Sequence, residues 1–262
     1  MKKERRMRTA LGEVFPWPAA ILSTGLIVMI AFIRLDFSRK IYVLSSWLDI
    51  LGGIKDVVDP PAFDLLQWLM LVAPPMYFVG TYLEQETRKR LPFVLIRSRS
   101  YSNWWFRIMK SILLGCLAHT LICFSIPTFA VLVSGGGLYQ SKGELLKAGM
   151  TPLVFFLYIV MASILQVLCY LLWEDKRFSF IVVTAFPMIS HLLCYVSPQW
   201  AVWSPGSWGM AWRYLSLADL EESGLKGNQY YIILPLMLLV SVGMYIYGKW
   251  LISKKGITVT DE

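Results

Sequence analysis

The sequence EQETRKRLPFVLIRSRSYSNWWFRIMK, residues 84–110, decides how the rest of this chain is arranged. It holds seven basic residues between two long apolar runs, in a chain that is 56% hydrophobic. Such a cationic block cannot lie in hydrocarbon, so it predicts a water-facing segment between two membrane spans, on the cytosolic side. The basic residues are Arg88, Lys89, Arg90, Arg97, Arg99, Arg107 and Lys110.

The overall composition supports an integral membrane protein. The 262 residues have a mean hydropathy of +0.56, only 16% charged residues and 11 Trp, which does not fit a water-soluble surface. The N-terminal MKKERRMR resembles the start of a signal peptide, but no small-residue cleavage site follows the first apolar run. We therefore expect the first span to stay in the protein.

Six apolar segments have the length of membrane spans, so the predicted fold class is an all-α integral membrane protein with a single domain, residues 1–262. The expected spans are 17–33, 63–83, 108–133, 150–173, 178–196 and 230–252. Pro74 and Pro75 interrupt the second span and should leave backbone carbonyls that need a partner from a neighbouring helix or water. We interpret the pair as a tolerated kink, with a hinge as the alternative.

The segments between the spans have their own patterns. Residues 3–15 predict an amphipathic helix on the inner leaflet, and residues 36–61 an external interfacial helix, because charges interrupt the latter too often for a span. Residues 174–177 are long enough only for a tight inner turn. Residues 197–229, rich in Trp, Pro and Gly, predict a re-entrant external element before the last span.

The distribution of charge orients the chain. With both termini in the cytosol, 17 of the 25 Lys and Arg residues lie in inner segments, and the inner and outer segments carry net charges of +9 and −1. This bias follows the positive-inside rule. The basic character of the chain is therefore an orientation signal, and no nucleic-acid partner is expected.

The sequence offers little for catalysis. It contains no G-x-x-x-x-G-K-[ST] phosphate loop, so the chain itself is not expected to hydrolyse ATP. The four cysteines fall within predicted spans; Cys116 and Cys123, about 10 Å apart along a helix, are too distant for a disulfide. No metal site and no enzyme activity are predicted.

A few polar residues are expected at membrane depth. We interpret His119 and His191 as neutral hydrogen-bond partners of adjacent helices, with a proton or substrate role as the alternative. Gln166 has a similar interpretation. With Pro74 and Pro75, these three are the candidates for a substrate pathway.

The cationic segment also has an internal order. Apolar residues 91–96 lie between basic residues, a polar turn follows, and Trp104, Trp105 and Phe106 stand at the membrane entry. This pattern predicts a short helix across the cytosolic face, anchored by an aromatic belt. Residues 102–105 (SNWW) with Lys110, preceded by Glu84 and Glu86, resemble the first cytosolic loop of type-two-like ABC exporter permeases. Ser100 stands where that family commonly has Pro, and Asn103 where it commonly has Arg.

The resemblance extends weakly to residues 204–210 and implies a function. In that family the loop carries a coupling helix that docks on a pair of ATP-binding subunits, and a second permease completes the membrane domain. ATP and magnesium would then bind only at the partner ATPase. The coupling residues implied are Glu84, Glu86, Arg90, Arg97, Arg99, Ser102, Trp104, Trp105, Arg107, Lys110, Glu174, Asp175, Lys176 and Arg177.

The resemblance also implies a location and a substrate class. It indicates a permease of the bacterial plasma membrane that exports or expels an antimicrobial peptide, as an exporter or an immunity transporter. Lipids, polysaccharides and drugs stay open as substrates. The alternative from another class is a stand-alone six-span protein without an ATPase, such as a channel or an immunity protein.

Overall fold

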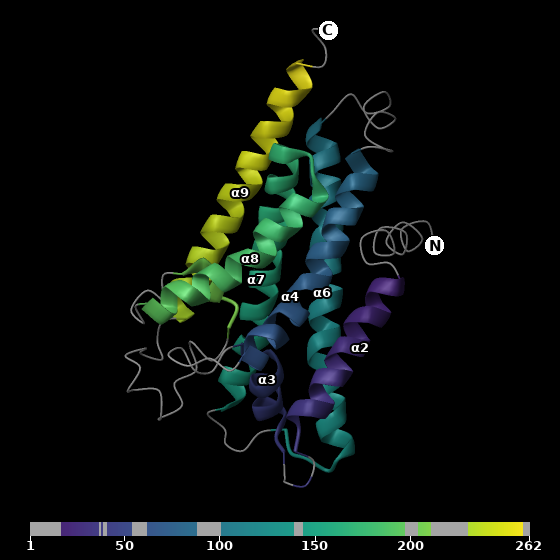
Figure 1. Cartoon of the computed structure of the whole chain (residues 1–262), viewed down its shortest axis with the longest axis vertical. Helices are drawn as coiled ribbons and strands as arrows, with labels where there is room; N and C mark the ends of the chain where they lie inside the picture. The colour runs from purple at the N-terminus through teal and green to yellow at the C-terminus, as the bar shows by residue number, and fades with distance from the viewer. Residues whose placement is uncertain are drawn as a thin grey trace.

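The computed structural model describes residues 17–36, 38, 41–53, 62–87, 101–138, 144–196, 204–210 and 230–258, and these are almost entirely helical (Figure 1). The elements are α2 (Trp17–Arg34), α3 (Val43–Leu51), α4 (Ala62–Gln85), α6 (Tyr101–Val133), α7 (Glu144–Trp173), α8 (Lys176–Val196), the 3-10 turn η3 (Pro205–Ser207) and α9 (Tyr230–Thr258). Within these ranges no β-strand forms, which confirms the all-α prediction. The predicted helix at residues 3–15 lies outside the described residues.

Four helices are long and apolar enough to cross a membrane. Their apolar stretches are Phe63–Gln85, Tyr101–Val133, Met150–Trp173 and Ile232–Lys254. These correspond to the second, third, fourth and sixth predicted spans. Helices α2 and α8 occupy the positions of the first and fifth, but the apolar stretch of α2 is shorter.

The helices form one bundle with α7 at its centre (Figure 1). Helix α7 packs against α4, α6, α8 and α9. In an 18-residue apolar stretch of α7, 78% of the residues are buried, compared with 22% for the corresponding stretch of α9. Helix α9 is therefore the most lipid-accessible of the four. The end of α4, the start of α6, the α7–α8 turn and the end of α9 lie at the same end of the bundle (Figure 1).

Aromatic side chains hold the centre of the bundle together. The ring of Trp68 on α4 lies 5.9 Å from Phe155 and 5.6 Å from Tyr158, both on α7. Phe124 on α6 lies 5.8 Å from Phe155. Edge-on and tilted contacts of this kind add to the packing of large apolar surfaces, so Phe155 is a shared contact of three helices.

Helix α3 is shorter than the helix predicted over residues 36–61, because residues 41–42 and 52–53 are not helical. It spans only Val43–Leu51, and Ile50 and Leu51 are fully buried. Trp47 Nε1 donates to Thr128 Oγ1 on α6 at 2.9 Å, so the helix packs against the bundle, and its position at a membrane interface stays a prediction. The charged residues Lys55 and Asp56, which suggested the interface, lie outside the described residues.

A polar cluster stabilises the end of the bundle where α2 and α3 end and α4 begins. Gln67 on α4 donates through Nε2 to the carbonyls of Asp49 and Ile50, at 2.9 and 2.7 Å, and so caps the last turn of α3. Arg34, the last residue of α2, donates to Gln67 Oε1 at 2.7 Å and forms an ion pair with Asp64. The ends of α2, α3 and α4 are thereby joined.

Residues 204–210, which contain the 3-10 turn η3 and no α-helix, form a largely buried segment beside α8 (Figure 1). The backbone N–H of Gly206 donates to Ser190 Oγ on α8 at 3.0 Å, and Gly209 lies directly against the ring of Tyr158 on α7. Non-helical backbone survives in a membrane protein only where protein shields it. These contacts would provide that shielding, but the re-entrant position of residues 204–210 stays a prediction. The rest of the predicted element, 197–203 and 211–229, lies outside the described residues.

Candidate functional site

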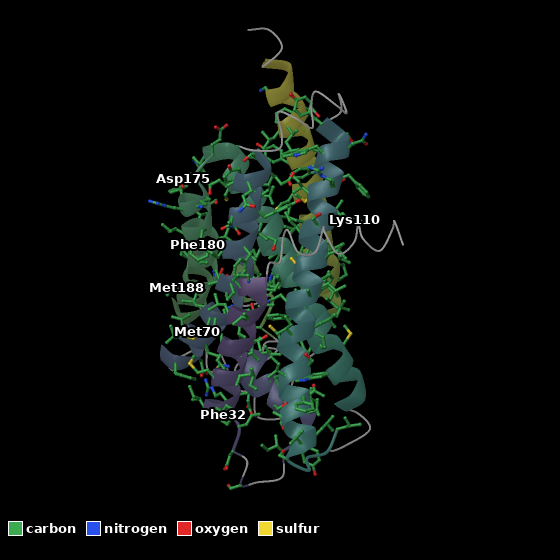
Figure 2. All side chains as sticks on the ribbon, turned by 90° about the vertical axis from the view of Figure 1, so that its right-hand side faces the viewer. Phe32, Met70, Lys110, Asp175, Phe180 and Met188 are labelled. Carbon is green, nitrogen blue, oxygen red and sulfur yellow. The ribbon has the colours of Figure 1, made fainter. Side chains whose placement is uncertain are left out.

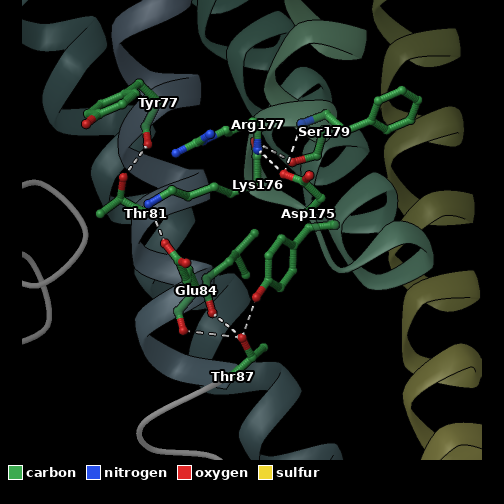
Figure 3. A network of polar contacts seen from close by, with 11 residues as sticks. Tyr77, Thr81, Glu84, Thr87, Asp175, Lys176, Arg177 and Ser179 are labelled. Atoms are coloured by element: carbon green, nitrogen blue, oxygen red, sulfur yellow. Dashed lines mark hydrogen bonds and ion pairs between the residues drawn. The ribbon is translucent and has the colours of Figure 1, made fainter.

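Glu84 in the last turn of α4, and Glu86 and Thr87 just after it, make polar contacts with three other helices. Figure 3 shows the contacts of Glu84 and Thr87. Glu84 forms an ion pair with Lys176, the first residue of α8. Glu86 Oε2 accepts from Arg107 on α6 at 2.7 Å, and Thr87 Oγ1 lies 2.7 Å from the hydroxyl of Tyr170 on α7. We call these six residues the α4-end network. Its members Glu84, Glu86 and Thr87 come directly before residues 88–100 of the cationic segment.

Glu86 is the most buried side chain of the α4-end network. The Glu86 side chain is 1% exposed, whereas that of Arg107 is 49% exposed. A buried carboxylate is costly unless a counter-charge and hydrogen bonds compensate for lost hydration. Arg107 therefore holds the start of α6 at a fixed position against the end of α4.

The α7–α8 turn has the short form that the sequence predicted. Only Glu174 and Asp175 separate the two helices, and Glu174 adopts a φ of 56°, which lets the chain reverse. Asp175 Oδ1 accepts from the backbone N–H groups of Arg177 at 2.7 Å and Phe178 at 3.3 Å. This is an N-cap, which satisfies backbone donors at the start of α8 and positions Lys176 for Glu84 (Figure 3).

Trp104 and Trp105 do not form the aromatic belt that the sequence suggested. They are 2% and 1% exposed, and the ring of Trp105 lies 5.7 Å from that of Tyr245 on α9. Helix α6 begins at Tyr101, seven residues before the predicted span. The two extra turns include this buried pair, which packs them against the bundle. Phe106, which is exposed, is the aromatic residue that faces outward.

The structure brings together part of the predicted coupling set. Glu84, Glu86, Arg107 and Lys176 meet in the α4-end network, and the α7–α8 turn adjoins it. Ser102 and Lys110 are exposed on α6 away from these pairs. Three predicted residues lie outside the described part of the chain, so their role stays a prediction: Arg90, Arg97 and Arg99.

Two contributors to this end were missed from the sequence. Thr87 and Tyr170 carry no charge, and neither position stands out in an apolar run. Thr87 also donates to the carbonyl of Leu83 at 2.8 Å, within its own helix. Only their positions close to the ends of α4 and α7 could have suggested them, because polar side chains there are within reach of neighbouring helix ends.

The membrane-depth polar residues divide into two cases. His119 is buried, and its Nε2 donates to the carbonyl of Leu71 on α4 at 3.0 Å, as expected for an interhelical partner. Gln166 on α7 is fully buried next to Gly80 of α4, yet neither atom of its amide has a hydrogen-bond partner among the described residues. The side chain of His191 lies outside the described part.

The described residues show no site for metal or thiol chemistry. No group of three His, Cys, Asp or Glu residues could hold a metal ion within these ranges. Cys116, Cys123 and Cys169 are buried and unpaired with one another. They pack as small apolar side chains.

Comparisons of the chain with protein-family models, curated proteins and solved structures found no match. The fold itself supports the class of helical membrane proteins, because at least four of its helices are long and apolar enough to cross a bilayer.

Proposed function

We propose that this chain is the permease subunit of an ABC transporter and forms half of a substrate pathway driven by separate ATP-binding subunits. The support is the α4-end network together with the resemblance of residues 84–110 to a permease coupling loop. All six helices in the positions of the predicted spans would cross the membrane, with both termini in the cytosol.

The observation that carries the proposal is the position of the α4-end network. Residues 88–100 connect Thr87 to Tyr101, so a partner that moves this segment acts on α4 and α6 directly. The ion pair of Glu84 with Lys176 and the contact of Thr87 with Tyr170 extend the movement to α8 and α7. Four helices thus respond to one cytosolic contact, which is what coupling to an ATPase requires.

The proposed mechanism assigns the chemistry of ATP to the partner. Closure of two ATP-binding subunits on ATP and magnesium pulls the coupling segments of two permeases, and the helices alternate between inward-open and outward-open arrangements. One chain supplies only half of such a pathway. A second copy or a related permease is the expected partner, in the plasma membrane of a bacterium.

The proposed substrate is an amphipathic molecule, with an antimicrobial peptide as the first candidate. The apolar interior of the bundle and the exposed apolar surface of α9 suit a molecule that partitions into the bilayer. Pro74, Pro75, Gln166, His119 and His191 stay as candidates for the pathway. Gln166 is the strongest of these, because its buried amide lacks a partner among the described residues.

The test exchanges charges within the coupling segment. The variant Arg97→Ser, Ser98→Arg, Arg99→Ser, Ser100→Arg keeps the net charge but turns each charge by about 100° if the segment is helical. We expect normal membrane insertion with lost stimulation of ATP hydrolysis, because losing a desolvated charged contact costs about 2–5 kcal/mol. Unchanged stimulation would reduce the segment to an orientation signal.

The second candidate is a stand-alone membrane protein. The α4-end network would then serve only to stabilise the bundle, as ion pairs at helix ends can do in any helical membrane protein. In that case the charge-exchange variant and the wild-type chain would both purify without an ATP-binding subunit.

A further inference from the structure

An apolar groove opens on the bundle surface between α6 and α9. It has a volume of about 480 Å³, within the range of small-molecule sites. Phe106, Lys110 and Leu113 line one wall, and Ser241 and Tyr245 belong to the other. The α7 side chains between these walls are apolar, so Lys110 contributes the groove's one charge.

The two walls run in opposite directions, which sets Lys110 opposite Ser241. Trp105 of α6 contacts Tyr245 of α9. From that contact the groove is lined by residues that follow Trp105 on α6 and by residues that precede Tyr245 on α9. Lys110 follows Trp105 by five residues and Ser241 precedes Tyr245 by four, so the Cα atoms of the lysine and the serine lie at about the same level along the bundle. No carboxylate among the described residues is within ion-pair distance of Lys110.

The length of α6 places this pair near the edge of the hydrocarbon. Its 33 residues extend about 50 Å, roughly 20 Å more than a typical hydrocarbon core. If the excess is shared equally, the first 10 Å or so lies among headgroups, and Lys110 is about 3 Å deeper. Lys110 lies in the first third of α6 (Figure 2). Because a lysine side chain on a helix points back toward the N-terminus, its ammonium is expected at headgroup level.

We propose that this groove binds one anionic phospholipid, with an acyl chain along the apolar walls and the headgroup phosphate between Lys110 and Ser241. The unpaired cation supplies charge complementarity, and the apolar lining suits a hydrocarbon chain. The proposal is independent of any ATPase partner. It needs only that α6 and α9 cross the membrane.

The experiment is native mass spectrometry of the full chain, purified in detergent with added phosphatidylglycerol or phosphatidylcholine of the same acyl chains. Phosphatidylglycerol should be retained preferentially. Lys110→Gln should lower that preference about fivefold, the usual effect of one cation at a lipid surface, whereas Lys110→Arg should keep it. Lys249→Gln, which removes an exposed charge of α9 outside the groove lining, is the matched control.

A second variant tests the apolar part of the groove. Ser241→Phe fills it and should reduce retention of both lipids, while the helical circular dichroism stays that of the wild type. Equal retention of the two lipids by the wild type, or an unchanged preference in Lys110→Gln, would overturn the proposal. So would a loss of dimer in Ser241→Phe with lipid retention intact, because the groove would then be a contact between two copies.

Discussion

The imidazole of His119 donates from Nε2 to the backbone carbonyl of Leu71, at 3.0 Å, between α6 and α4. Leu71 is four residues before Pro75, and proline has no N–H to give to that carbonyl. The histidine therefore replaces the hydrogen bond that the proline removes. This explains how the hydrogen bonding of α4 is maintained at Pro75 in the interior of the bundle.

The first prediction is an energetic coupling between Pro75 and His119. His119→Leu should destabilise the wild-type chain by about 1–2 kcal/mol, because the Leu71 carbonyl loses its partner. In the Pro75→Ala background the alanine N–H can serve that carbonyl, so the same change should cost about 1 kcal/mol less. Unfolding of the four purified chains in detergent measures the coupling.

Pro74→Ala is the control for that cycle, because its N–H would serve the carbonyl of Met70 instead. His119→Leu should cost as much in the Pro74→Ala background as in the wild type. Additive effects in both backgrounds would show that His119 does not compensate for Pro75. Loss of transport in His119→Gln, with normal expression and stability, would instead assign His119 to the substrate or proton pathway.

The second prediction concerns the Glu86–Arg107 pair. Arg107→Gln should destabilise by about 3 kcal/mol, because it removes the positive charge that Arg107 supplies to the buried Glu86 carboxylate. Glu86→Gln should cost less, since the half-exposed guanidinium of Arg107 can turn to water. Thermal unfolding of each chain gives the order, and the double variant should resemble Glu86→Gln.

Arg177→Gln serves as the control, because it removes an exposed charge of α8 at the same end of the bundle. It should change stability by less than about 0.5 kcal/mol. An equal loss of stability in Glu86→Gln and Arg107→Gln would contradict the asymmetry that their burial predicts.

The third prediction tests how residues 204–210 are held. A Cβ at Gly206 would lie 2.3 Å from Ser190 Oγ and 2.7 Å from the Phe186 carbonyl oxygen, so Gly206→Ala should displace the segment from α8. Labelling of a cysteine placed at Ser207, which is buried, should then rise severalfold. A Cβ at Gly243 meets nothing within 4 Å, so Gly243→Ala should leave labelling unchanged.

A further prediction is the topology. On a background without the native cysteines, Arg97→Cys should react only with reagents that reach the cytosol, whereas Lys55→Cys, Lys142→Cys and Lys226→Cys should react with impermeant reagents from outside. Modification of Arg97→Cys from outside would invert the orientation and remove the basis for a cytosolic coupling segment.

The helices themselves were predictable, because a long apolar run has few possible structures other than a membrane-spanning helix. The start of α6 was not, since Trp104 and Trp105 suit an interfacial belt and a bundle core equally well by composition. Because both are buried, replacing them by alanine would remove core packing, so a loss of coupling in a Trp104→Ala/Trp105→Ala variant would not identify a partner contact. Arg97 and Arg99 give the cleaner test.

The contacts at the α4 end were harder to anticipate. The sequence gives the charges of Glu86 and Arg107, but 21 residues separate them, and only the tertiary packing of α4 against α6 pairs them. The carbonyl freed by Pro75 was foreseeable from helix geometry. Its partner was not, because His119 could be identified as an interhelical donor but not matched to Leu71.

The most direct measurement of the central claim is co-purification. The tagged full chain is extracted from the membranes of its native host, and the proteins retained with it are tested for photolabelling by an azido-ATP analogue and for a Walker A sequence by mass spectrometry. The account predicts an ATP-binding subunit that is retained by the wild type and lost in the Arg97–Ser100 charge-exchange variant. Recovery of the intact chain with no ATP-binding protein would contradict it.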